Sequence, residues 1–252
     1  MAIDTGFDLR TDAFGKDPDV YSATLRRYHK LLWSKPLPSG AVFSLDDGTP
    51  GVYLHHRSAL GEFSLSSDTV IPTFTLWPAL KHITDQLPES ENEAFRTMQY
   101  TIGGMMVWPG NRIGGRQTIN AARGFHPRIK DRMDLTLECV RRHYLGQSSP
   151  LNEALWRYRD FFALFVSFSG FVDFFLLQDM VTADRTAVTF FMPFGDFLTP
   201  AVPQNLDSYR QFRERSMDFI QARNRRIPGL RSPSYNDCRF GCACPVHRGV
   251  RP

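Results

Sequence analysis

The most apolar segment of the chain runs from Phe161 to Leu177, and its length and composition limit what the protein can fold into. A membrane-spanning helix needs roughly 20 consecutive apolar residues. This segment has 17 residues, contains Asp173, and is interrupted by Ser169 and Gly170. It therefore predicts two elements of a buried core rather than a membrane helix, and no membrane partner is expected.

The overall composition agrees with a folded protein that buries a large core. Of the 252 residues 42% are hydrophobic and 13% are aromatic, which is ample for a core in one large domain or two small ones. The first residues, 1–6, lack the cationic start and apolar stretch of a secretory signal. A cytoplasmic location is therefore expected.

The hydrophobic pattern predicts alternating helices and short strands. Helical periodicity predicts amphipathic helices at 22–33, 77–87, 90–98, 129–145, 149–165 and 207–226, and strands are predicted at 41–45, 51–55, 62–65 and 186–192. Residues 102–108 are apolar on both alternations, as in a central strand covered on both faces. These elements predict a single α+β domain over residues 1–227, with a central mixed or antiparallel sheet and several packed amphipathic helices.

Apolar periodicity ends at Pro228, and residues 228–252 form a tail rich in Arg, Pro and Cys. This composition predicts a disordered segment. Cys238, Cys242, Cys244 and His247 are enough ligands for tetrahedral Zn²⁺, but they lack the usual paired spacing. The zinc alternative stays open, and no cofactor or metal site is assigned.

The segment from residue 111 to residue 130 is the best candidate for a site, because it holds five cationic side chains and no acidic one. It also contains Gly114, Gly115 and Gly124, which allow the backbone to approach a ligand closely. Its length, between a buried strand and the next helix, is typical of a functional loop. The residues predicted to bind an anion are Arg112, Arg116, Thr118, Asn120, Arg123, His126 and Arg128. A surface loop held by its own hydrogen bonds is the competing interpretation.

The glycine spacing of this segment excludes the two standard phosphate loops. No Gly-Lys-Ser/Thr sequence follows the glycines, as a Walker A loop requires, and the spacing does not match a dinucleotide fingerprint. Any nucleotide would therefore be bound in another way.

The helix that follows carries the candidate catalytic residues. Asp134 and Glu138 are like charges one turn apart on the side predicted to be exposed, an arrangement that costs stability unless a cation lies between them. That cation could be Arg123, Arg128 or Mg²⁺, and a solvated helix face is the alternative. Glu138 is the candidate general base, with His143 or His126 as its acid partner.

Two classes of function are compatible with these residues. The first is an enzyme or toxin-like effector that acts on a phosphorylated small molecule or nucleotide held by the 111–128 loop. The second is a protein that binds nucleic acid or an acidic partner without chemistry, since residues 201–252 carry 10 basic and 4 acidic groups. Whether the protein is an enzyme is left open.

Several segments together resemble one family. They are residues 51–55 (Gly-Val-Tyr-Leu-His), 60–63 (Leu-Gly-Glu-Phe), 118–124 (Thr-Ile-Asn-Ala-Ala-Arg-Gly), 131–139 (Asp-Arg-Met-Asp-Leu-Thr-Leu-Glu-Cys) and 174–177 (Phe-Phe-Leu-Leu). The chain resembles a bacterial family of uncharacterised proteins over residues 1–227. The resemblance implies a bacterial or phage-borne intracellular protein, and it implies no catalytic residues because that family has no established activity.

Overall fold

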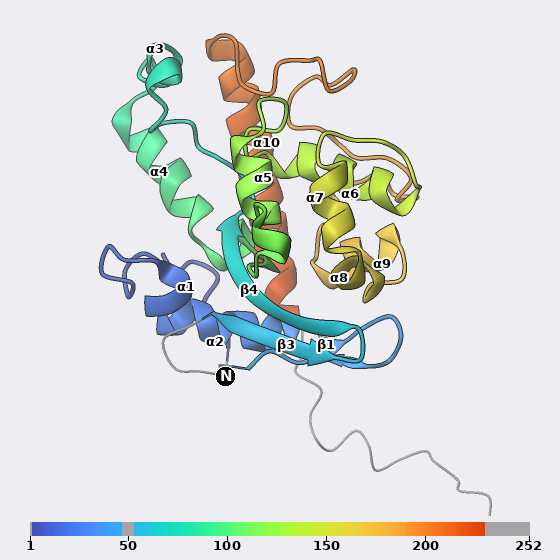
Figure 1. Cartoon of the computed structure of the whole chain (residues 1–252). Coiled ribbons are helices and arrows are strands. Elements are labelled where there is room, and N and C mark those ends of the chain that lie inside the picture. Colours follow the sequence, from blue (N-terminus) through green and yellow to red (C-terminus); the bar gives the residue numbers. More distant parts are fainter. Residues whose placement is uncertain (1, 47–52, 230–252) are drawn as a thin grey trace, which may run out of the picture.

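The structure, a computed structural model, describes residues 2–46 and 53–229, and it has the predicted α+β architecture (Figure 1). Its helices are α1 Pro18–Tyr21, α2 Ala23–Trp33, α3 Lys81–Thr84, α4 Glu89–Gln99, α5 Ile119–Phe125, α6 Met133–Tyr144, α7 Asn152–Arg157, α8 Arg159–Ala163, α9 Phe168–Phe174 and α10 Leu206–Arg226. Its strands are β1 Lys35–Pro36, β2 Val42–Phe43, β3 Leu54–Ser58, β4 Gly61–Thr69 and β5 Met105–Pro109. The cysteines of the predicted tail lie outside the described residues.

The larger sheet is antiparallel, in the order β3-β4-β5. Its register pairs Leu54 with Leu65 and Ser67 with Val107, and β1 pairs with β2 in a separate two-stranded sheet. The strand predicted over residues 102–108 forms as β5 and is buried along its whole length. It lies at the edge of the sheet rather than at its centre, because helices cover it where a further strand could have paired.

The longest helix, α10, passes behind α5, with α3 and α4 to one side and α7 to α9 to the other (Figure 1). A capping box begins it. The Asn205 side chain accepts from the Ser208 N–H, and the Ser208 hydroxyl oxygen accepts from the Asn205 N–H. Its buried face includes Tyr209, Phe212 and Phe219. The buried apolar side chains form one continuous cluster along the described chain, so these helices share a core.

The apolar segment 161–177 contributes to two core helices, α8 and α9, which confirms the predicted division, but the predicted interruption at Ser169 and Gly170 lies inside α9. The break falls at Val166, which has a φ of 66°, and Ser167 then caps α9 by accepting from the Gly170 N–H at 3.1 Å. A Cβ atom on Gly170 would lie 2.2 Å from the Phe165 carbonyl oxygen, so only glycine fits there. Within residues 2–46 and 53–229, no helix is both long and apolar enough to cross a membrane.

Arg223, on the buried face of α10, is fully enclosed. Its guanidinium donates to the backbone carbonyls of Phe175 at 2.9 and 3.2 Å, Gly103 at 2.9 Å and Met105 at 2.7 Å. No carboxylate of the described residues pairs with it, and burial lowers its pKa to about 9. This arginine therefore links α10 to β5 and to the end of α9. The amphipathic pattern of α10 does not indicate this role.

Several predicted elements differ from the structure. The helix predicted over 149–165 is divided into α7 and α8, and residues 102–104 of the predicted strand form a 3-10 turn before β5. Residues 77–87 form a short 3-10 turn and α3 rather than one helix, and residues 186–192 form only an isolated bridge between Val181 and Val188. The predicted 111–128 loop contains α5, which begins at a side-chain cap on Thr118. Short helices of this kind are stabilised by tertiary packing rather than by their own propensity, so periodicity detects them poorly.

The N-terminal helix α1 is attached to β4 by the half-buried carboxylate of Asp19. Both oxygens of Asp19 accept from the Ser67 N–H, at 2.8 and 2.9 Å, and the Ser67 hydroxyl also donates to Asp19. Burial raises the pKa of Asp19 to about 7; the hydrogen bonds from Ser67 oppose this, and the charges of Asp17 and Asp68 add to it.

We expect Asp19 to make the stability of the protein depend on pH. Because its folded pKa lies above the ordinary value of 3.8, its contribution to stability is present below about pH 4 and is lost as the pH rises through about 7. Asp19→Asn keeps the shape without the charge, so it should melt higher than the wild type at pH 8 and close to it at pH 4.5. Melting curves across this range test the expectation, and parallel curves would contradict it.

Candidate functional site

Two of the predicted anion-binding side chains instead fix α5 in place. The Thr118 hydroxyl caps the helix by accepting from the Ala121 N–H at 3.2 Å. The Asn120 amide donates to the Ser66 hydroxyl of β4 at 3.1 Å. These bonds explain the local structure and leave little of either side chain for a ligand.

Arg123 is enclosed, with 0% of its side chain exposed. Its Nη1 contacts the carboxylates of Asp68 at 2.8 Å and Asp131 at 2.7 Å, its Nη2 donates to the Asp131 carbonyl at 2.6 Å, and its Nε donates to the Thr136 hydroxyl at 3.3 Å. The guanidinium therefore has two anionic partners within the protein. It joins α5, α6 and β4 and is not available to an external anion.

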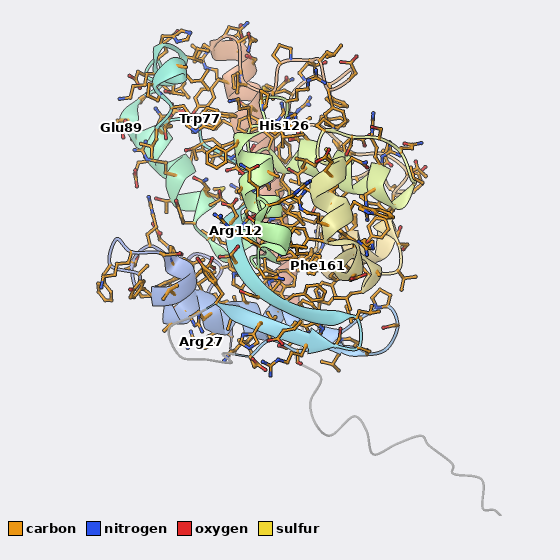
Figure 2. The ribbon with its side chains drawn as sticks, viewed as in Figure 1. Arg27, Trp77, Glu89, Arg112, His126 and Phe161 are labelled. Carbon is orange, nitrogen blue, oxygen red and sulfur yellow. The ribbon has the colours of Figure 1, made fainter. Side chains whose placement is uncertain are left out.

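Arg112 and Arg116 are exposed, unlike Arg123. Arg116 approaches only the exposed Glu153, at 3.7 Å. Figure 2 shows Arg112 well separated from His126, so the loop residues do not converge on one point. The residues predicted to bind an anion therefore fall into three groups. Thr118, Asn120 and Arg123 hold α5 in place, Arg112 and Arg116 are exposed, and His126 and Arg128 remain.

The acidic residues of α6 are not exposed, which corrects the prediction made from the helix pattern. Asp134 is fully buried, receives the Arg132 guanidinium (3.0 Å from Nε), and accepts from the Phe191 N–H at 2.9 Å. Glu138 is 4% exposed and has its own arginine partners. Each carboxylate is thus paired by cations near it in the sequence, and neither Arg123 nor Arg128 lies between them. Nor do three potential metal ligands cluster anywhere in the described chain.

Glu138 is paired with two arginines. Arg141 donates to it from Nε at 2.7 Å and from Nη2 at 2.9 Å, and Arg142 donates from Nε at 2.7 Å. Burial acts to raise the pKa of the Glu138 carboxyl, but these hydrogen bonds outweigh burial and hold that pKa below its ordinary value. A carboxylate with this pKa is a weak general base.

The second candidate catalytic residue, His143, packs among aromatic rings. Its ring lies 5.1 Å from that of Phe162 and 5.9 Å from that of Tyr144, and burial lowers its pKa. It does not contact Glu138 through any hydrogen bond, so the two residues do not form an acid–base pair.

His126 and Arg128 border an open hollow between the α5–α6 connection and the end of α6, which we call the cationic hollow. It has a volume of about 590 Å³. Its lining consists of His126, Pro127, Arg128, Arg142, Ser148, Ser149, Pro150 and Phe197. Donor groups from three segments therefore meet here, and none of the lining residues carries a carboxylate.

Arg142 is held firmly at the wall of the cationic hollow. Its Nε is fixed by Glu138, its Nη1 donates to the Ser148 carbonyl at 3.3 Å, and its plane lies 4.9 Å from the centre of the Phe197 ring. Three contacts on one guanidinium restrict its rotamers, so the Arg142 side chain would lose little conformational entropy when a ligand binds. Among the hydrogen bonds of the described chain, none occupies its Nη2.

His126 faces the same hollow as a hydrogen-bond donor. Its Nδ1 accepts from the Arg128 N–H at 3.1 Å, so the proton of the neutral ring lies on Nε2. Burial, and then the charge of Arg128, lower the pKa of His126. A bound anion would reverse the second effect and favour the protonated ring.

The residues that sequence reasoning missed are Arg142, Ser148 and Ser149. Arg142 lies on the helix predicted over 129–145 and Ser149 at the start of the helix predicted over 149–165, so the sequence pattern gives each residue a helical role and assigns neither to a site. One sequence feature could have indicated these residues: the 147–150 turn directly follows a helix whose last turn is basic. Only the fold shows that this turn lies beside the α5–α6 connection.

Comparison with known proteins places the chain in a family without assigning an activity. No curated protein and no solved structure matches it. A family of unknown function (DUF6994) matches residues 3–227, nearly the whole range over which the sequence resembles one family. The chain therefore belongs to this family of unknown function (DUF6994).

Proposed function

We propose that the protein binds a phosphorylated small molecule through the cationic hollow. The observation that carries this proposal is the meeting of Arg128, Arg142 and His126 around one hollow that no carboxylate lines. Arginine is well suited to phosphate because its planar group can donate two parallel hydrogen bonds. Phosphorylated small molecules carry the anionic group that this chemistry binds.

The buried Glu138 supports the proposal, although it is not the general base expected from the sequence. It accepts from both Arg141 and Arg142, so the three side chains together keep one net positive charge. Its role is to orient Arg142 before a ligand binds. Less of the binding free energy is then lost in ordering this side chain. We therefore propose binding and assign no reaction.

The surface of α10 gives less support to nucleic-acid binding. Arg213 pairs with Glu91 at 2.9 Å, Arg226 pairs with Asp179, and Arg223 is buried. A cationic face whose arginines already have partners offers fewer charges to phosphates. The basic composition of the C-terminal segment therefore supports nucleic-acid binding less than the cationic hollow supports binding of a small phosphorylated ligand.

Arg128→Ala should weaken the binding of pyrophosphate about tenfold or more, because it removes one charge-assisted contact from the hollow. Arg112→Ala is the matched control: it removes an exposed arginine of the same segment that does not line the hollow, so affinity should stay within about twofold. Calorimetry on both variants and the wild type measures the effect. Equal losses in the two variants, or no binding by the wild type, would overturn the proposal.

Salt dependence separates the hollow from a nucleic-acid surface. Binding of pyrophosphate should fall only moderately between low and physiological salt, whereas a nucleic-acid surface that contacts many phosphates loses affinity steeply. Tight, strongly salt-dependent binding of a DNA or RNA oligonucleotide, unaffected by Arg128→Ala, would favour the nucleic-acid function instead.

A further inference from the structure

A second hollow opens beside the cationic hollow and shares a wall with it. The shared wall consists of His126, Pro127, Ser148, Ser149 and Pro150. The second hollow has a volume of about 630 Å³, and its remaining lining includes Gln117, Phe125, Asn152, Glu153 and Arg157. A ligand that extends past the shared wall would therefore meet aromatic, amide and carboxylate groups.

The two hollows differ in the charges that line them, and this difference would determine which end of a bound ligand lies in which hollow. Glu153 is the one carboxylate in the two described linings, and it lies on the side away from Arg128 and Arg142. Its side chain is 85% exposed, and Arg116 approaches it at 3.7 Å. A phosphate would be repelled by Glu153 and drawn to the arginines, while hydroxyl groups could donate to Glu153 as ribose does to an acidic residue in other nucleotide sites.

Phe125 provides a flat apolar surface at the second hollow. Its side chain is 77% exposed although it ends α5, a helix that is otherwise packed on the sheet. An exposed phenylalanine at a polar hollow suits a stacked base, since every base has a π face. The amides of Gln117 and Asn152 line the same hollow and can donate to and accept from a base edge.

Two buried polar atoms at these walls have no internal partner. The Ser149 hydroxyl, in the shared wall, lies beside the Cys139 thiol but has no partner of hydrogen-bond geometry among the described residues. The Arg157 Nε is likewise unpaired, while its Nη2 donates to the Gln117 carbonyl at 2.7 Å. Buried polar groups are normally satisfied, so the Arg157 Nε leaves room for an additional polar group, whereas the Ser149 hydroxyl has the Cys139 thiol beside it.

We propose that the ligand of the joined hollows is a free 5′-mononucleotide, an inference that rests on the proposed binding of phosphate in the cationic hollow. The phosphate lies among Arg128, Arg142 and His126, the ribose hydroxyls donate to Glu153, and the base stacks on Phe125. The nucleotide crosses the shared wall, which Ser149 lines.

The test compares AMP with ribose 5-phosphate by calorimetry, because the two share the phosphate and the sugar and differ in the base. The wild type should bind AMP about tenfold tighter or more, a gain typical of one stacked base. Phe125→Ala should remove that gain and leave the affinity for ribose 5-phosphate unchanged. Trp156→Ala is the control, because Trp156 is also exposed but lines neither hollow, and it should keep the gain.

A second variant tests the sugar contact independently. The wild type should prefer AMP to 2′,3′-dideoxy-AMP, and Glu153→Gln should reduce this preference while ribose 5-phosphate and AMP still bind at the arginines. If Phe125→Ala weakens both AMP and ribose 5-phosphate equally, or if Glu153→Gln leaves the preference intact, the assigned orientation is wrong.

The outcomes also separate the two proposals. Equal affinity of the wild type for AMP and ribose 5-phosphate would overturn the nucleotide inference while the phosphate site stands. No binding of either compound or of pyrophosphate would overturn both. An oligonucleotide that binds much tighter than AMP would replace the free nucleotide with single-stranded nucleic acid.

Discussion

Replacing Arg223 by methionine is expected to lower the free energy of unfolding by about 4 kcal/mol, because three buried carbonyl oxygens lose their donor at roughly 1–3 kcal/mol each. Those oxygens belong to Phe175, Gly103 and Met105. Part of the loss is offset, since methionine also removes a charge that is costly to bury. The melting temperature should fall by roughly 10 °C.

Arg225→Met is the matched control for this prediction. Arg225 lies two residues along the same helix but is exposed, so its replacement should change stability by about 0.5 kcal/mol or less. Chemical denaturation of both variants gives the comparison. If Arg223→Met unfolds at the same denaturant concentration as Arg225→Met, the arginine does not hold α10 to β5.

Replacing Arg123 by methionine is expected to cost about 3 kcal/mol at pH 8, because it leaves Asp68 and Asp131 beside each other without their shared cation. Both contact the same nitrogen of Arg123, within 2.8 Å. Their side chains keep 28% and 26% exposure, so water reduces the penalty below that of a fully buried pair. Arg112→Met, in an exposed position of the same segment, should leave stability nearly unchanged.

The cost of Arg123→Met should shrink as the pH falls. In the wild type, burial raises the pKa of Asp68 to about 6, Arg123 opposes this rise, and Asp131 adds to it. Without Arg123 the pKa of Asp68 rises further, so the penalty is largest at high pH, falls as the pH drops through the raised pKa, and has faded below about pH 6, where Asp68 is protonated in both proteins. A penalty that stays constant from pH 5 to pH 8 would show that lost packing, not charge, causes it.

The fold class and most long elements could be predicted from the sequence. The α2 and α10 helices follow apolar periodicity with clear caps. The apolar segment 161–177 is divided as predicted, but the break falls at Val166 rather than at Ser169 and Gly170, which lie inside α9. Short elements could not be predicted in this way. The helix predicted over 149–165 covers α7 and α8 but not the break between them, and the seven residues of α5 lie in a predicted loop because so short a helix depends on packing against neighbours distant in the sequence.

The candidate site could be predicted only in part, because a sequence shows charges but not their partners. Arg123 and Arg128 look equivalent in the segment, yet one is buried between two carboxylates and the other lines a hollow. The acid-free stretch 111–130 suggested free cations, while the neutralising Asp68 comes from β4, a distant strand. Arg142 was missed because its partner Glu138 gave it an ordinary surface role.

The position of a bound anion tests the central proposal most directly. Titration of the isotope-labelled protein with pyrophosphate, followed by NMR of backbone amides and of arginine and histidine side chains, locates it. We expect saturable shifts at His126, Arg128, Arg142, Ser148 and Ser149, with the His126 ring becoming easier to protonate. Shifts confined to Arg112 and Arg116, or spread along α10, would contradict the assignment of the cationic hollow.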